Sequence, residues 1–196
     1  MKRIGLFGGS FDPVHLGHLL VAQAACEELD LERLFFIPAA QSPFKSVSQP
    51  APPEVRLRML RLALAGQSSY EIDDQEIRRG GVSFTIDTAR SYKDRFPDAE
   101  LFYLIGADHV PTLPKWRDAE ELARLVQFVV IPRPGETPAS LSPPYQIRIL
   151  SGWPLKLSSS QIRLRAQKQL SIAHLLPPGV SEVIGETRPY HTDNNR

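Results

Sequence analysis

The residues best suited to chemistry lie near the N-terminus, between a predicted strand and a predicted helix. The stretch reads Gly8-Gly9-Ser10-Phe11-Asp12-Pro13-Val14-His15-Leu16-Gly17-His18. His15 and His18 are three residues apart, so their imidazoles share one face of the first helical turn. The glycines permit a tight turn and expose backbone N–H groups, and the helix N-terminus adds a positive dipole end. Together these features indicate an anion site suited to a phosphate.

A second candidate segment reads Leu157-Ser158-Ser159-Ser160-Gln161-Ile162-Arg163 and opens a helix near the C-terminus. Its serines can cap the helix and bind phosphate oxygens, and Arg163 can reach the same anion with two parallel N–H donors. By itself the segment is explained best as an ordinary serine cap. Beside the histidine motif it indicates a second phosphate clamp. Neither segment is a dinucleotide fingerprint or a Walker A loop.

The elements that must position these segments follow from alternating apolar runs and helical patterns. The order predicts an α/β fold: one Rossmann-like, doubly wound parallel sheet with helices on both faces. We assign residues 1–188 to this domain and 189–196 to a C-terminal tail. Ligands of such sheets bind at the carboxyl ends of the strands, where both segments lie. Strands are predicted over 3–7, 34–37, 101–105, 128–131 and 147–150, with a short strand within 70–77, and helices over 19–29, 53–65, 85–96, 119–125, 159–169 and 180–186.

Composition excludes several classes of protein. The 196 residues are 42% hydrophobic, which suits a globular domain, and the formal net charge is only +1. A near-neutral chain is not expected to bind nucleic acid or an anionic membrane through bulk charge. The single cysteine, Cys26, permits no intrachain disulfide, and no signal segment or membrane span is evident, so a cytoplasmic location is expected.

The motifs resemble those of the nucleotidyltransferase superfamily, and more narrowly those of bacterial nicotinate mononucleotide adenylyltransferases. The stretch 8–18 fits the family's opening motif fully, and segments 82–88, 104–108 with Trp116, 130–135 and 175–180 resemble its later motifs in order. The sequence departs from the family where Phe44 replaces a frequent histidine and where Gln169 replaces a frequent glycine. Leu157 and Ser160 stand where isoleucine and threonine are usual.

The resemblance implies transfer of AMP from ATP to the 5′-phosphate of nicotinate mononucleotide. The products would be deamido-NAD and pyrophosphate, in NAD biosynthesis, by direct in-line attack without a covalent enzyme intermediate. Mg²⁺ held mainly by the ATP phosphates would be the cofactor, with no side-chain metal ligands evident. The resemblance implies catalytic roles for His15, His18, Arg163 and Lys45; ATP binding by Gly8, Gly9, Ser10, Phe11, His15, His18, Gly106, Asp108, Ser158, Ser159 and Arg163; and mononucleotide binding by Thr85, Trp116, Arg133 and Lys45.

Several alternatives stay open at the level of the sequence. Asp108 could bond a ribose hydroxyl or cap a helix, and Trp116 could stack on the pyridine ring or belong to the core. His109 is expected to be a bystander. Rival functions are another nucleotidyltransferase, acting on phosphopantetheine or making a CDP-linked product, and a nucleotide-binding regulator without turnover. The sequence decides neither the choice between acid and amide substrate nor the oligomeric state, and a homo-oligomer is possible.

Overall fold

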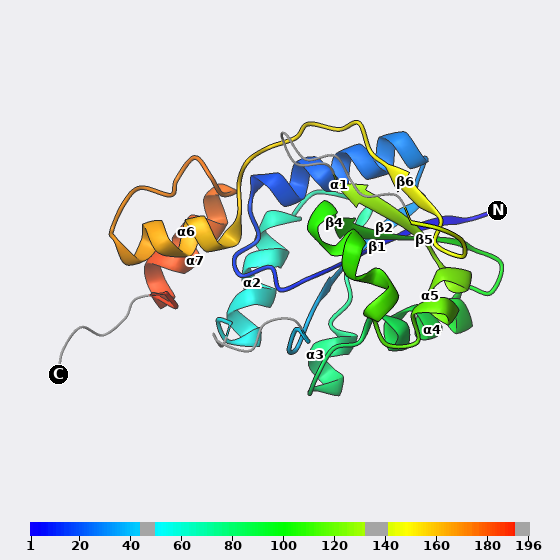
Figure 1. Ribbon diagram of the computed structural model, residues 1–196. Coiled ribbons are helices and arrows are strands. Elements are labelled where there is room, and N and C mark those ends of the chain that lie inside the picture. The colour runs from blue at the N-terminus through cyan, green and yellow to red at the C-terminus, as the bar shows by residue number, and fades with distance from the viewer. Residues whose placement is uncertain (44–49, 132–140, 191–196) are drawn as a thin grey trace.

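A parallel sheet forms the centre of the computed structural model, which describes residues 1–43, 50–131 and 141–190 (Figure 1). The sheet has six strands in the order β3-β2-β1-β4-β5-β6, and every neighbouring pair is parallel. The order reverses between β1 and β4, and this confirms the predicted doubly wound, Rossmann-like sheet. The strands are β1 (Arg3–Gly9), β2 (Arg33–Pro38), β3 (Tyr70–Ile72), β4 (Glu100–Gly106), β5 (Gln127–Ile131) and β6 (Ile147–Ile149).

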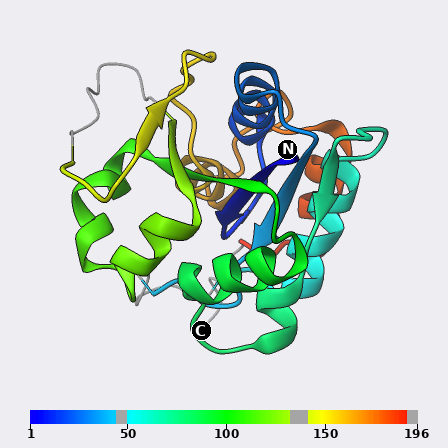
Figure 2. The same ribbon diagram turned by 90° about the vertical axis from the view of Figure 1, so that its right-hand side faces the viewer.

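Helices cover both faces of the sheet, and Figure 2 shows α1 and α4 on opposite sides of the strands. None of the helices within the described ranges is long and apolar enough to cross a membrane. The helices are α1 (Leu16–Leu29), α2 (Pro53–Ala63), α3 (Gln75–Arg79), α4 (Thr85–Arg95), α5 (Ala119–Leu125), α6 (Ser159–Gln167) and α7 (Pro178–Thr187), with a 3₁₀ helix η1 (Ala107–Lys115).

Alternate residues of each strand enter two separate cores. On β4, Phe102 and Leu104 pack with α1, α2, α6 and α7, whereas Leu101, Tyr103 and Ile105 pack with α4 and α5. Successive side chains of a strand point to opposite faces, so a strand covered on both faces must be apolar throughout. This explains why the central strands appear in the sequence as continuous hydrophobic runs.

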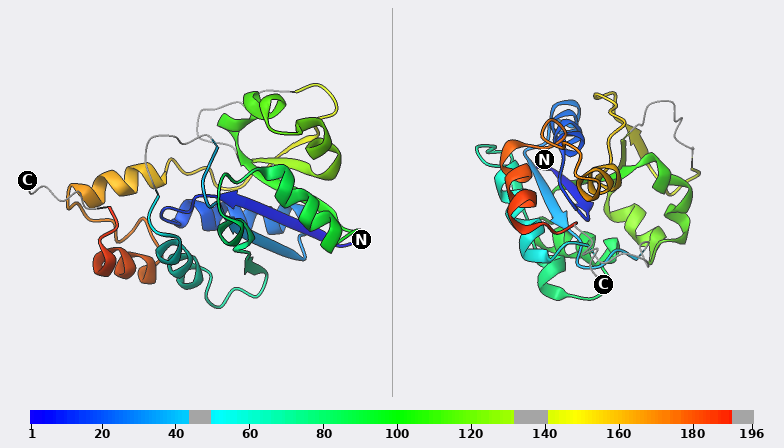
Figure 3. Two further views of the ribbon diagram at one scale, coloured as in Figure 1. Left: turned by 90° about the horizontal axis from the view of Figure 1, so that it is seen from below. Right: turned by 90° about the vertical axis from the view of Figure 1, so that its left-hand side faces the viewer.

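The C-terminal pair α6 and α7 lies beyond the carboxyl ends of the strands (Figures 1 and 3). Helix α7 packs against α2, and Ile162 and Val180 belong to the same core as α1. Tyr190 falls in the segment 189–196 that the sequence assigns to a tail, yet only 6% of its surface is exposed. The packed structure therefore extends to the last described residue.

Two local predictions differ from the structure, whereas the short strand expected within 70–77 is confirmed as β3. It ends at Ile72, because the Asp73 carboxylate accepts a hydrogen bond from the backbone N–H of Gln75 at 3.0 Å and α3 begins there. Residues 107–115 form η1, although Pro111 and Pro114 gave no helical signal. Gly8 and Gly9 do not form the turn but end β1. A side chain at Gly8 would collide with the Tyr103 hydroxyl.

The turn after α6 contains a strained residue. Gln169, which replaces the glycine frequent in the family, has a φ of +55°, a left-handed conformation that costs a residue with a Cβ about 1–2 kcal/mol. We expect Gln169→Gly to raise the free energy of unfolding by about 1 kcal/mol, after the larger entropy of glycine in the unfolded chain is subtracted. Thermal and urea unfolding measure the change.

The matched control is Gln167→Gly, which changes the same residue type at the exposed end of α6. Its φ is not left-handed, so glycine there should lower the free energy of unfolding by up to about 1 kcal/mol. A loss of stability in both variants would contradict the assigned strain at Gln169.

Candidate active site

A cleft of about 700 Å³ opens at the carboxyl ends of the central strands. The predicted residues Phe11 and Arg163 are not among those that line it, and Lys45 and Arg133 lie outside the described residues. The structure does bring most of the predicted residues together, from five separate parts of the chain. Those lining the cleft are Gly8, Gly9, Ser10, His15, His18, Thr85, Gly106, Asp108, Trp116, Ser158 and Ser159.

The two histidines are stacked at the start of α1. His15 occupies the N-cap and His18 the first turn, with ring centroids 3.7 Å apart and planes inclined by 27°. Phe7 and Phe11 contact the other side of His18, with ring centroids at 5.8 and 5.1 Å. A side chain at Gly17 would contact the His15 ring at about 3.0 Å, so glycine allows the stack to form.

Hydrogen bonding fixes how each imidazole can act. The backbone N–H of His15 donates to Nδ1 of His18 at 3.1 Å, so neutral His18 carries its proton on Nε2 and can donate from there. Burial lowers the pKa of His15 from 6.5 to about 4, so this imidazole is neutral at neutral pH. His15 therefore contributes no positive charge near pH 7.

The second segment is joined directly to the turn that precedes α1. Ser158 caps α6, with its hydroxyl accepting from the backbone N–H of Gln161 at 3.3 Å. Ser159 donates to the carbonyl of Pro13 at 3.0 Å, and Arg163 donates to the carbonyl of Asp12 at 2.7 Å. The α6 N-terminus therefore opens into the same cleft as the histidines, as the two motifs predict.

Aromatic and hydroxyl side chains from η1, α4 and β4 also line the cleft. The Trp116 indole donates to the Thr112 hydroxyl at 3.2 Å, and the ring of His109 meets it edge to face at 6.0 Å. Thr85 begins α4, and its hydroxyl lies 3.4 Å from that of Tyr103. Asp108 lies inside η1, whose N-cap is Gly106, so the N-cap alternative for Asp108 is wrong.

Comparison with known proteins identifies the family. The sequence pattern of the cytidylyltransferase-like family matches residues 6–165. The chain belongs to this family. Among curated relatives, a protein of Opitutus terrae named "Probable nicotinate-nucleotide adenylyltransferase" is 42% identical over 190 residues, covering 96% of this chain and 97% of the relative. A Shouchella clausii protein of the same name is also 42% identical, over the full length of both chains.

Solved structures agree on the fold. The nicotinic acid mononucleotide adenylyltransferase of Plasmodium falciparum, complexed with NaAD, superposes with a TM-score of 0.78. It is 20% identical in sequence and covers 97% of this chain, with 98% of its own chain matched. Within the cytidylyltransferase-like family, this chain is therefore a nucleotidyltransferase of the nicotinate-nucleotide adenylyltransferase group.

Several residues that line the cleft were not predicted from the sequence. Tyr103 lies within an apolar strand, which gave no sign of a binding role. Trp153 lies in an irregular segment, where the Gly-Trp-Pro sequence was the one available signal of such a role. Glu76 is 4% exposed and accepts a hydrogen bond from the Thr88 hydroxyl at 2.6 Å, and burial raises its pKa. The Ser83 hydroxyl accepts a hydrogen bond from the backbone N–H of Ala40 at 3.0 Å.

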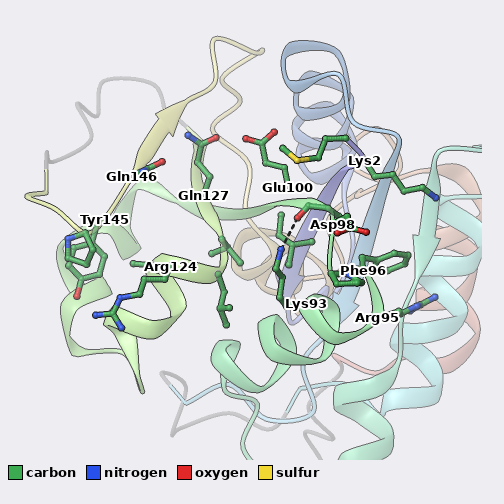
Figure 4. A pocket seen from close by; sticks show the side chains of 18 of the residues that line it. Lys2, Lys93, Arg95, Phe96, Asp98, Glu100, Arg124, Gln127, Tyr145 and Gln146 are labelled. Carbon is green, nitrogen blue, oxygen red and sulfur yellow. Dashed lines mark hydrogen bonds between the residues drawn. The ribbon is translucent and has the colours of Figure 1, made fainter.

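A larger hollow, of about 1310 Å³, lies at the opposite edge of the sheet, where strands begin (Figure 4). Its cations already have partners: Lys2 pairs with Glu32, Arg95 with Asp73 and Arg124 with Glu120, at 3.4 to 3.6 Å. Helices α4 and α5 end there, and helix C-termini disfavour anions. Volume alone would select this hollow, but its chemistry does not suit a nucleotide.

The burial of His15 predicts a pH dependence of stability. Because the pKa is about 4 in the folded chain and 6.5 in the unfolded chain, the unfolded chain binds more protons between these values. The contribution of neutral His15 to the free energy of unfolding is therefore complete above pH 6.5 and falls with acidification. Between pH 7.5 and 4.5 we expect the wild type to lose about 2.5 kcal/mol more than His15→Gln.

Urea unfolding at a series of pH values measures this difference. His174→Gln, which removes an exposed imidazole, is the matched control for the substitution itself. Parallel stability curves for the wild type and His15→Gln would show that His15 titrates alike in both states.

Proposed function

We propose that the protein transfers AMP from ATP to the 5′-phosphate of nicotinate mononucleotide, releasing pyrophosphate and forming deamido-NAD for NAD biosynthesis. The observation that carries this proposal is the junction of the histidine motif with the α6 N-terminus in one cleft. Both substrates are anions, so positioning and charge neutralisation are the main tasks of such a site. The names of the full-length relatives support the same reaction.

In this proposal the mononucleotide phosphate attacks the α-phosphorus of ATP directly, in line with the leaving pyrophosphate. The state of the possible protein nucleophiles supports a route without a covalent intermediate. Burial raises the pKa of the Cys26 thiol to about 11, and Cys26 does not line the cleft. The Ser159 hydroxyl donates to a carbonyl, which does not remove its proton.

Fixed donors would stabilise the charge that develops on the phosphates. His18 would donate from Nε2 to the α-phosphate, while the N-terminus of α6, with Ser158 and Ser159, would hold the departing phosphates. Arg163 would bind them after turning from the Asp12 carbonyl, and Lys45 would approach from its loop. The α6 N-terminus is preorganised by the contact of Ser159 with the turn, so its own donors need little reorganisation, whereas Arg163 has to leave the Asp12 carbonyl.

Mg²⁺ would enter on ATP, where it would neutralise the polyphosphate. Within the ranges that the structure describes, no cluster of three His, Cys, Asp or Glu side chains could hold a metal ion. The hydroxyl-rich start of α6 and the carboxylate of Asp108 are oxygen donors that suit a hydrated Mg²⁺ held mainly by phosphate oxygens.

The remaining residues would orient the two nucleosides. Gly106 and Asp108 would contact a ribose, Trp116 would stack on the pyridine ring, and Thr85 would bind the substituent of that ring. Arg133 would meet its carboxylate or a phosphate. Trp116 and Thr85 line the same cleft as the α6 N-terminus but come from η1's C-cap and the start of α4, which supports this division.

The reaction is tested with pure protein, Mg²⁺, ATP and nicotinate mononucleotide, by following pyrophosphate release and identifying the dinucleotide formed. We expect stoichiometric pyrophosphate and deamido-NAD. Nicotinamide mononucleotide in parallel gives the acid-to-amide ratio of kcat/KM, and phosphopantetheine tests the rival substrate class. Failure with both mononucleotides would exclude the proposed reaction, and ATP binding without turnover would favour a regulator.

The role of His18 is tested by His18→Ala. Loss of a donor aimed at developing charge costs about 10² to 10³ in kcat, so we expect a fall of that size. The variant should remain folded, because the His18 side chain is partly exposed and is not a core residue. Steady-state kinetics and circular dichroism measure both properties. His174→Ala is the control, and near-normal turnover of His18→Ala would remove His18 from the mechanism.

A further inference from the structure

Asp12 is a buried carboxylate that the proposed reaction does not use. Only 5% of the residue is exposed, and it lies in the turn between β1 and α1. Its Oδ1 accepts two hydrogen bonds, from the backbone N–H of Ala51 at 3.2 Å and from the hydroxyl of Tyr190 at 2.9 Å. A buried carboxylate needs such partners, because an unpaired one carries a large desolvation penalty.

The other carboxylate oxygen of Asp12 faces Arg163. Nη1 of Arg163 lies 3.8 Å from Oδ2, while it donates to the backbone carbonyl of the same aspartate at 2.7 Å. Nη2 donates to the Ser160 hydroxyl at 3.1 Å, and the Arg163 side chain is 23% exposed. Asp12 is thus close enough to compete with a phosphate for this guanidinium.

A buried arginine, Arg56, holds the backbone segments around Asp12 in place. Arg56 has no exposed surface and donates to the carbonyls of Ala51 at 3.0 Å, and of Ser10 and Ala39 at 2.8 Å each. These carbonyls belong to the segments after β1 and β2 and before α2. The backbone of the turn is therefore held in place. If the Asp12 carboxylate rotates, only its side chain moves.

We propose that Tyr190 is a positioning residue: its hydroxyl keeps the Asp12 carboxylate from moving closer to Arg163 than the present 3.8 Å, so that Arg163 stays available for the ATP phosphates. This inference rests on the proposed function, because it assumes that Arg163 binds ATP. Burial and the neighbouring carboxylate raise the pKa of Tyr190, so the phenol keeps its proton and donates at neutral pH. Without that donor, Asp12 rotates toward Arg163 and forms the paired geometry that guanidinium and carboxylate favour.

The expected consequence is selective for ATP. In Tyr190→Phe, ATP must displace Asp12 from Arg163, so KM for ATP rises about tenfold or more. The KM for the mononucleotide and kcat at saturating ATP change by less than about threefold. Calorimetric titration with a non-hydrolysable α,β-methylene analogue of ATP and Mg²⁺ measures the same loss of affinity without turnover.

The chain offers a matched control in Tyr92. Its side chain is also buried, and its hydroxyl donates to the Asp73 carboxylate at 2.7 Å, but neither residue lines the cleft. Tyr92→Phe removes the same kind of hydrogen bond and lowers Tm without changing KM for ATP. Equal effects of the two substitutions on KM for ATP would overturn the proposal.

A double-mutant cycle separates positioning from general loosening of the fold. In an Arg163→Ala background there is no guanidinium to capture, so adding Tyr190→Phe leaves the affinity for the ATP analogue unchanged. The same fold-loss in both backgrounds would overturn the proposal. If Tyr190→Phe does not fold, Asp12→Asn is measured instead. Its amide oxygen still accepts from Ala51 and Tyr190 but cannot capture Arg163, so analogue affinity stays within about twofold of wild type.

These results separate the inference from the proposed function. A wild type that binds the ATP analogue but makes no deamido-NAD contradicts the proposed reaction, while the cycle still measures the coupling of Tyr190 to Arg163. A wild type that makes deamido-NAD, with a tenfold weaker Asp12→Asn or additive losses in the cycle, supports the reaction and overturns the role of Tyr190.

Discussion

The turn between β1 and α1 must keep its backbone in place without the help of a helix or a strand, and the rest of the site depends on this. Irregular backbone inside a protein needs a partner for each polar group. Here the partners are one buried and two partly buried side chains: Arg56 donates to the carbonyl of Ser10, Arg163 to that of Asp12, and Ser159 to that of Pro13. The same bonds attach α6 to the sheet. One set of contacts thus both fixes the turn and places a helix N-terminus beside the histidines.

The structure of the turn also bears on which groups give the cleft its positive potential. Because the formal net charge is only +1, any attraction of the phosphates depends on groups local to the cleft. The low pKa of His15 makes its imidazole a neutral, stacked support for His18 at neutral pH. In the proposed site the attraction would therefore come from backbone N–H groups, the α6 N-terminus and Arg163, together with Lys45, Arg133 and Mg²⁺. A stacked pair of imidazolium rings would repel each other, so burial of His15 also lets the two rings lie 3.7 Å apart.

The sequence was informative wherever a local rule applied and silent where a contact joined distant segments. Continuous apolar runs predicted the parallel strands, and the histidine spacing predicted a shared face, because both depend on neighbours along one element. Gly8 was assigned to a turn, whereas the close approach of Tyr103, 95 positions away, is what requires glycine. Tyr190 was assigned to a tail, since nothing in a proline–tyrosine pair reveals a bond to an aspartate at the other end of the chain. Glu76 gave no signal in the sequence, and only the tertiary fold places the Thr88 hydroxyl against its carboxylate.

Buried polar side chains lie behind both ends of the cleft. Asp12, His15 and Arg56 support the turn, and Glu76, Ser83 and Thr88 support the start of α4, where Thr85 lies. Apolar residues of similar volume would often give a more stable core, because burying charges costs desolvation energy. They would not, however, hold particular carbonyls and N–H groups in one orientation, which hydrogen-bond networks do. Among the described residues, the buried charged side chains Asp12, Arg56 and Glu76 adjoin the cleft, where two anionic substrates would have to be aligned.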